Sequence, residues 1–153
     1  MFDLTKTPAR RLVIAENFYA DPDAVRSFAL MQEFQPNLQD HKGQRTLKQF
    51  RDDIIRDKFE SLLGMSIYNW NKYAYNGVFQ FCTKTDQIVF HSDIQTYAAV
   101  VYLTPDAPPN AGTSIYRSKA TKGRTAEESS RLNGRSAEAN VKEMYVGNLL
   151  NPD

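Results

Sequence analysis

Two helical patterns precede most of the strand-like patterns of this chain, and this order constrains the fold more than any other feature. Asp21-Pro22 predicts the start of a helix, because an aspartate side chain caps free backbone amides and proline fits the first helical position. Val25, Phe28 and Ala29 follow at helical spacing. These three residues are therefore the predicted buried side of the first helix.

A second helix is predicted over residues 50–63, where apolar residues recur at helical intervals, and Gly64 is its predicted end. The apolar stripe of this helix consists of Phe50, Ile54, Ile55, Phe59, Leu62 and Leu63. A short strand is expected over 11–15, before the first helix. Residues 37–47, between the two helices, are expected to form a polar loop.

After Gly64 the apolar and aromatic residues alternate or run together, which is typical of β-strands. The predicted strands cover residues 67–75, 77–83, 88–91, 97–103 and 113–116. The run over 97–103 is almost continuously apolar, so this strand is expected to be covered on both faces. Helices followed by antiparallel strands predict an α+β, mainly β fold rather than a parallel βαβ fold.

Beyond the last predicted strand the chain becomes polar, and basic residues outnumber acidic ones. Residues 117–140 are therefore expected to be a long polar loop or disordered. A last short element is expected within 144–150. With 153 residues, the chain is expected to be a single domain, 1–153.

Composition narrows the possible partners and compartment. Cys82 is the only cysteine, so an internal disulfide framework is excluded and a reducing, cytoplasmic location is expected. Its thiol is expected to be a small buried group. No signal-peptide pattern or membrane-length apolar run occurs, so no membrane partner is expected. A formal net charge of +1 gives no support to a nucleic-acid partner, and only the scattered charges of 117–142 favour one.

His91 and Asp93 form the most specific chemical motif. In an extended segment, residues two apart project from the same face, so the imidazole and the carboxylate can reach one ion. They are two of the three ligands of a 2-His-1-carboxylate iron site. The tripeptide alone is more often a solvated ion pair at the end of a strand. No histidine follows His91, and the other histidine, His41, lies in the polar loop and is expected at the surface.

The sequence around this motif resembles the Fe(II)/2-oxoglutarate-dependent oxygenase superfamily, which includes the prolyl hydroxylases. It is most similar to a small branch from bacteria and marine phages. The likeness covers most of 11–117. It lies in His91-x-Asp93, the apolar run 98–103, the Thr104-Pro105-Asp106-Ala107-Pro108 turn, Gly112-Thr113, Tyr116-Arg117, and the N-terminal segments 13–19, 21–26 and 43–46.

The resemblance implies a double-stranded β-helix, a cupin-like jelly-roll, with N-terminal helices. His91 and Asp93 would bind Fe(II), and 2-oxoglutarate would be the co-substrate. The implied activity is oxidative decarboxylation of 2-oxoglutarate coupled to hydroxylation of a protein side chain or a small molecule. Tyr97 and Tyr102 lie near the motif and are candidates to bind the co-substrate carboxylate, although aromatic residues in strands more often belong to a core.

The family pattern also requires a later histidine and a basic residue that binds 2-oxoglutarate, and neither has a matching position here. The chain is therefore expected to be an incomplete oxygenase-like domain with a partial jelly-roll. The alternative is a catalytically inert jelly-roll that serves binding or assembly. Either form would expose sheet edges, so a homo-oligomer that completes the sheet between chains is expected.

Overall fold

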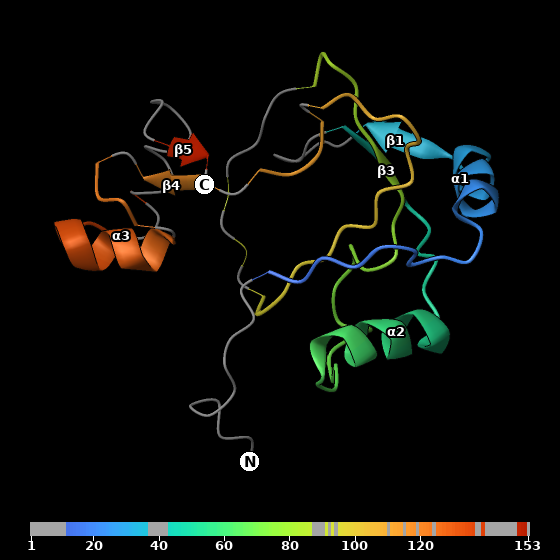
Figure 1. Cartoon of the computed structure of the whole chain (residues 1–153), viewed down its shortest axis with the longest axis horizontal. Helices are drawn as coiled ribbons and strands as arrows, with labels where there is room; N and C mark the ends of the chain where they lie inside the picture. Colours follow the sequence, from blue (N-terminus) through green and yellow to red (C-terminus); the bar gives the residue numbers. More distant parts are fainter. Residues whose placement is uncertain are drawn as a thin grey trace. The chain divides into compact units, whose positions relative to one another are not determined.

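The computed structural model describes residues 12–36, 43–86, 91, 93, 95–109, 111–114, 116–118, 120–123, 125–136, 139 and 150–152. Contacts along the chain divide it into two compact units (Figure 1). The N-terminal unit comprises 1–37 and 43–83, and the C-terminal unit comprises 38–42 and 84–153. Helices and antiparallel strands both occur, so the predicted α+β class is confirmed.

Helix α1, Pro22–Leu30, forms as its sequence predicts. The Asp21 carboxylate accepts a hydrogen bond from the Ala24 amide at 2.8 Å, and proline occupies the first turn. Of the predicted buried side, Ala29 is buried, whereas Phe28 remains 43% exposed. The cap therefore fixes where the helix begins, while a small residue is the one buried residue of the helix.

Helix α2, Asp53–Leu63, begins three residues later than predicted. The reason is local, because the Asp52 carboxylate accepts the Ile55 amide at 2.8 Å and so acts as the N-cap. Gly64 ends the helix in the left-handed region, at φ 67°, as predicted. This conformation is one that glycine adopts without a steric cost.

The N-terminal unit contains an antiparallel sheet with the order β1-β2-β3. Its strands are β1 Phe34–Pro36, β2 Gln44–Thr46 and β3 Gln80–Phe81. The prediction of a polar loop over 37–47 was wrong for β2, which is the central strand. Pairing with a partner on each side stabilises this polar strand, and such pairing overrides local preference. The predicted strand over 77–83 is confirmed only for the two residues of β3.

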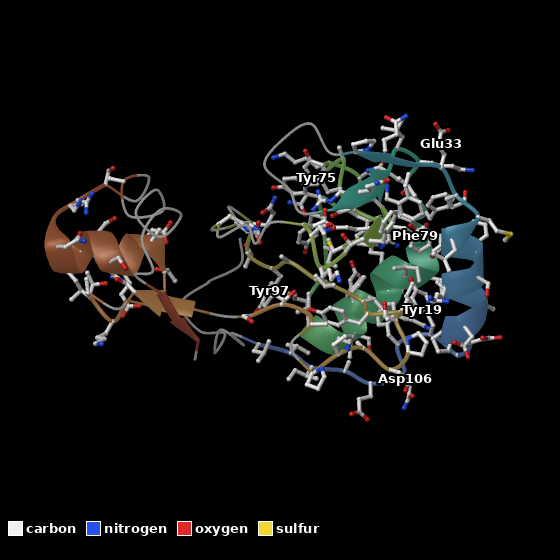
Figure 2. The ribbon with its side chains drawn as sticks, turned by 90° about the horizontal axis from the view of Figure 1, so that it is seen from above. Tyr19, Glu33, Tyr75, Phe79, Tyr97 and Asp106 are labelled. Atoms are coloured by element: carbon white, nitrogen blue, oxygen red, sulfur yellow. The ribbon has the colours of Figure 1, made fainter. Side chains whose placement is uncertain are left out.

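Aromatic rings form the interior of the N-terminal unit. Phe50 lies centrally, with its ring centroid 5.2 Å from that of Phe28 and 5.1 Å from that of Phe79. Figure 2 shows Phe79 among the side chains beside α1. Phe59 of α2 contacts Phe18 at 4.8 Å and Trp70 at 6.1 Å between centroids. Trp70 is half-buried.

Residues 68–72 and 74–77 form turns, so the predicted strand over 67–75 was wrong. Side-chain donors from outside and inside this turn segment bind its carbonyl groups. The Gln49 amide and the Arg51 guanidinium both donate to the Tyr73 carbonyl oxygen at 3.1 Å. The Asn76 amide donates to the Trp70 carbonyl oxygen at 2.8 Å. These bonds use acceptors that a strand would offer to its neighbour.

In the C-terminal unit, β4 Tyr116–Ser118 pairs antiparallel with β5 Leu150–Pro152, and helix α3 spans Ala126–Asn133. The prediction of loop or disorder over 117–140 was therefore wrong for α3. Thr125 caps the helix by accepting the Glu128 amide at 3.0 Å, and Gly134 ends it at φ 71°. The sequence of this polar segment does contain two local helix signals, the capping residue Thr125 and the terminating residue Gly134.

Small residues pack the start of α3. Ser129 is fully buried and Ala126 is 4% exposed. The Ser129 hydroxyl lies 3.0 Å from the Thr121 hydroxyl, and the Ser118 amide donates to the Gly123 carbonyl at 2.8 Å. A Cβ atom on Gly123 would lie 2.6 Å from the Ser129 hydroxyl oxygen. The close approach therefore requires glycine at 123.

Residues 97–103, all of which the structure describes, form no strand. Val100 and Tyr102 are 63% and 61% exposed, so the prediction of a strand covered on both faces was wrong. An apolar run becomes a strand only where a partner strand pairs with it, and sequence continuity does not supply one. Residues 12–15 also lack strand structure, and a strand begins at Tyr116 rather than at 113.

Two predicted elements lie mostly outside the residues that the structure describes. Residues 87–90 and 141–149 lie outside the described residues, so the structure bears on neither the strand over 88–91 nor most of the element over 144–150.

None of the helices in the part of the chain that the structure describes is long and apolar enough to cross a membrane.

Candidate functional site

His91 and Asp93 lie close together in a part of the C-terminal unit without regular secondary structure. The His91 Nε2 atom is 3.6 Å from the Asp93 Oδ1 atom. The two side chains are 59% and 46% exposed. An imidazole nitrogen and a carboxylate oxygen are thus held side by side and remain open to solvent.

The donor set of this pair suits a divalent cation. Two ligand atoms that each bind one cation at about 2.1 Å lie no more than about 4.2 Å apart, and the observed 3.6 Å falls within this limit. Among the described residues, no group of three or more histidine, cysteine, aspartate or glutamate side chains could hold a metal ion. His41 lies outside the described residues. The pair therefore supplies two ligands and leaves the other positions to other groups.

Tyr102, a candidate for co-substrate binding, has a defined partner. Its hydroxyl donates a hydrogen bond to the Thr113 Oγ1 atom at 2.6 Å, and its side chain is 61% exposed. Gly112 precedes Thr113 at φ 110°, a conformation that residues with a Cβ atom rarely adopt. The Gly112-Thr113 turn thus brings a threonine hydroxyl to the tyrosine.

Tyr97, the second candidate, is half-buried (Figure 2). Its hydroxyl forms no hydrogen bond to any described residue, so it can donate to a ligand. Spacing in the sequence singled out both tyrosines. It could not reveal that Thr113 would be the hydrogen-bond partner of Tyr102, because that contact depends on the conformation of the turn between them.

Cys82 is exposed, which corrects the prediction of a buried thiol. It follows β3, whose two residues are also exposed, and its Sγ atom accepts a hydrogen bond from the Gln80 side-chain amide at 3.3 Å. β3 is an edge strand, so among the described residues no neighbouring strand lies beyond it in the sheet. The sulfur is therefore accessible to reagents.

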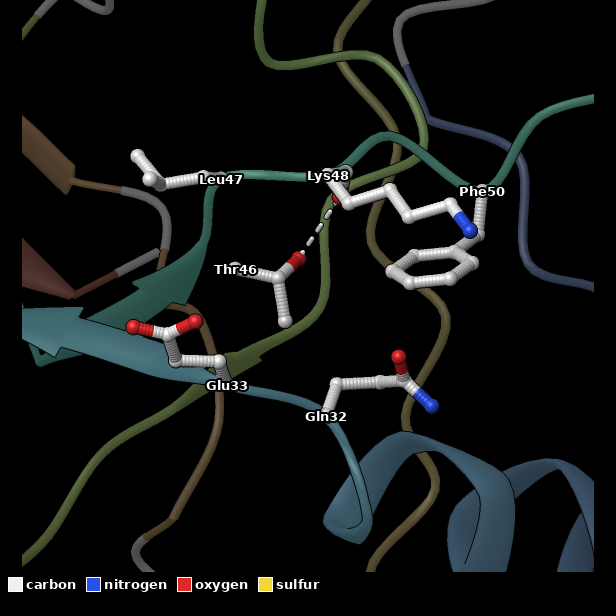
Figure 3. A pocket seen from close by; sticks show the side chains of 6 residues that line it. All are labelled: Gln32, Glu33, Thr46, Leu47, Lys48 and Phe50. Atoms are coloured by element: carbon white, nitrogen blue, oxygen red, sulfur yellow. Dashed lines mark hydrogen bonds between the residues drawn. The ribbon is translucent and has the colours of Figure 1, made fainter.

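Two open cavities lie in the N-terminal unit, and sequence reasoning found neither of them. Figure 3 shows the first, of about 230 Å³, where the Thr46 hydroxyl donates to the Lys48 carbonyl oxygen at 2.9 Å. Its lining residues are Gln32, Glu33, Thr46, Leu47, Lys48 and Phe50. The second, of about 250 Å³, is lined by Ala15, Glu16, Asn17, Phe18, Lys58, Ser61 and Leu62.

The two lysines at these cavities make contacts within the unit. The Lys48 ammonium lies 5.3 Å from the centroid of the Phe50 ring. The Lys58 ammonium donates to the Phe18 carbonyl oxygen at 2.8 Å and lies 5.4 Å from the centroid of its ring. The residues that line either cavity include no histidine or cysteine. His91 and Asp93 therefore remain the best candidate for metal chemistry.

Comparison of the chain with protein-family models, with curated proteins and with solved structures gives no match.

Proposed function

We propose that His91 and Asp93 are two of the iron ligands of an Fe(II)/2-oxoglutarate-dependent oxygenase-like domain. The observation that carries this proposal is the 3.6 Å separation of the His91 Nε2 and Asp93 Oδ1 atoms. The resemblance of the surrounding sequence to that superfamily supports it. The substrate class is a protein side chain or a small molecule, which would be hydroxylated once the site is complete.

When bound, Fe(II) with 2-oxoglutarate supplies oxidative decarboxylation coupled to hydroxylation of a C–H bond. The residues of this chain would bind the metal ion and orient the co-substrate. His91 offers a lone pair at Nε2 only in its neutral form, and Asp93 binds only as a carboxylate. Both side chains are about half exposed, so a complete site also requires a cover that excludes water.

Tyr102 would contribute to co-substrate binding through its hydroxyl. This hydroxyl has one proton, which it donates to Thr113. A carboxylate that accepted this proton would require Thr113 to donate back to the tyrosine oxygen, and a threonine hydroxyl can do so. Tyr97 would donate from a hydroxyl that has no other acceptor among the described residues.

The same proposal includes a finer fold and an assembly. The domain would be a jelly-roll, with which the antiparallel pairing of β4 and β5 is compatible. The third ligand and the basic residue for 2-oxoglutarate would come from another segment or another chain. A homo-oligomer that pairs exposed strand edges would supply both a cover and additional ligands.

The test is an anaerobic titration of the chain with Fe(II) and 2-oxoglutarate, followed by the visible absorption band of the chelate. We expect a band with the wild type and at least about a tenfold weaker affinity in Asp93→Asn, because loss of a ligand carboxylate costs more than loss of its supporting groups. Asp106→Asn is the matched control, because Asp106 is an exposed aspartate of the same unit. It is expected to retain the band.

Two outcomes would contradict the proposal. A folded wild-type chain without the band would favour the inert binding or assembly module. A band of equal strength in Asp93→Asn would place the metal elsewhere. Sedimentation velocity tests the assembly separately, since a single monomeric species at all concentrations would exclude completion between chains.

A further inference from the structure

One face of the three-stranded sheet carries a row of polar side chains. Arg45 of β2 is in register with Gln35 of β1 on one side and with Gln80 of β3 on the other. Residues paired across neighbouring strands project from the same face, so Arg45 lies between two glutamine residues on this face. Phe34 and Phe81 each lie next to a residue of this row, so they project from the opposite face of the sheet. Their ring centroids are 4.9 Å apart. The two phenylalanine rings thus lie on the face of the sheet opposite Arg45, together with Gln44 and Thr46.

The Arg45 guanidinium is held by contacts that use only part of it. Its Nε atom donates to the Gln80 Oε1 atom at 2.7 Å. Its central carbon lies 5.0 Å from the centroid of the Tyr75 ring, as in a cation–π contact. Tyr75 lies beside the sheet in Figure 2. The two terminal Nη groups, which form the fork that binds oxyanions, are not used in these contacts.

Arg45 also has no counter-ion in the part of the chain that the structure describes. The salt bridges among those residues involve Arg56 and His91, and no carboxylate lies within 4.0 Å of the Arg45 guanidinium. Arg45 is half-buried, and this burial lowers its pKa, although the nearby Tyr75 and Cys82 act in the opposite direction. An arginine keeps its charge in proteins, so Arg45 is held partly desolvated with neutral partners and with no carboxylate beside it among the described residues.

We propose that Gln35, Arg45, Tyr75 and Gln80 form a binding site for a small oxyanion, a carboxylate or a phosphate group. The Arg45 Nη groups bind two of its oxygen atoms, which is the geometry that distinguishes arginine from lysine. Gln35 adds a donor from the neighbouring strand. Gln80 and Tyr75 are positioning residues that fix the plane of the guanidinium.

The binding site has a built-in reporter in Cys82, the only cysteine of the chain. The Cys82 Sγ atom is exposed and accepts a hydrogen bond from Gln80, the residue that also binds Arg45. A positive charge beside a thiol favours an anionic reagent over a neutral one. The ratio of the Cys82 alkylation rates with iodoacetate and with iodoacetamide therefore measures the field of Arg45.

The experiment measures this ratio for the full chain with and without inorganic phosphate or succinate, at an ionic strength matched with sodium chloride. A saturable decrease of at least about threefold is expected, because a bound anion neutralises Arg45. Phosphate and succinate are separate arms, so a decrease with only one of them identifies the preferred oxyanion.

The variants assign the effect to Arg45. Arg45→Gln is expected to lower the ratio and abolish its anion dependence, and Arg45→Lys to retain the charge but bind the anion more weakly. Arg26→Gln, which removes a charge from α1, is the matched control and is expected to behave as the wild type. A wild-type ratio that neither anion changes would overturn the proposal, even if Arg45→Gln did not fold. An equal loss in Arg26→Gln would do the same.

Discussion

Aromatic rings from three separate segments meet in the N-terminal unit, whereas in the C-terminal unit small polar side chains make the closest contacts around α3. Phe50 has two ring neighbours at about the same distance. Ser129, by contrast, is fully buried and bonds to the Thr121 hydroxyl. The first kind of contact is broad and apolar, and the second depends on close backbone approach.

This difference predicts that the two units lose stability in response to different kinds of substitution. Ring packing responds to the volume removed, because stability follows the buried apolar area and the cavity that remains. A close backbone contact responds to volume added, because nothing can move aside without displacing the chain. Truncation and enlargement therefore test the two units separately.

The largest expected effect is that of Phe50→Ala. Removal of this half-buried ring should lower the free energy of unfolding by about 2–3 kcal/mol, somewhat less than for a fully buried phenylalanine. Urea unfolding followed by the fluorescence of Trp70, the only tryptophan, reports on this unit. Tyr68→Ala, at an 83% exposed residue, should stay within about 0.5 kcal/mol. A similar loss in both variants would refute an aromatic interior.

An intermediate effect is expected for Gly123→Ala. The added methyl group would lie 2.6 Å from the Ser129 hydroxyl oxygen and 3.0 Å from the Ser129 nitrogen, so α3 must shift, at a cost of about 1–2 kcal/mol. The Ser129 amide donates to the Thr125 carbonyl oxygen at 3.0 Å, and its hydrogen exchange should become faster.

Gly134→Ala separates this clash from backbone strain. A Cβ atom there would meet no atom within 4 Å, although φ is 71°. The expected cost is about 1 kcal/mol from strain alone, confined to the end of α3. Unchanged exchange at Ser129 in Gly123→Ala would show that the close approach does not stabilise the helix.

The smallest expected effect concerns alkaline pH. Burial, and secondarily the negative charge of Asp52, raises the pKa of Tyr19 above its ordinary value. The folded state therefore holds the phenol proton more tightly than the unfolded state. The resulting stability is present below the unfolded pKa and is lost as the pH rises from there through the folded pKa.

Tyr19→Phe should accordingly lose less stability than the wild type between about pH 9 and about pH 11. The control is Tyr68→Phe, which should follow the wild-type curve because Tyr68 is 83% exposed. Parallel curves for all three proteins would show that Tyr19 is not coupled to folding.

The sequence predicted the parts of the fold that depend on nearby residues. Asp21, Gly64 and the beginning of α1 follow from capping and steric rules that act within a few residues. The strands over 67–75 and 97–103 were predicted wrongly because a strand depends on a distant partner, which an apolar pattern does not specify. The polar β2 strand was missed for the same reason.

The candidate site divides in the same way. The proximity of His91 and Asp93 follows from their spacing of two residues, and the structure gives the distance. The Tyr102–Thr113 contact depends on the turn at Gly112, and the position of Arg45 between two glutamines depends on strand register. No pattern within a single segment contains these contacts.

The turn segment over 68–77 has one more consequence. The side chains of Gln49 and Arg51, which lie outside the segment, both donate to the Tyr73 carbonyl oxygen. The acceptor belongs to the backbone of the segment, so these bonds do not depend on its side chains. Residues outside the segment therefore help to set its course, together with bonds inside it such as that from the Asn76 amide to the Trp70 carbonyl oxygen. Positions such as Tyr68 are free to diverge during evolution, or to accept a grafted epitope, provided that Gln49 and Arg51 are retained.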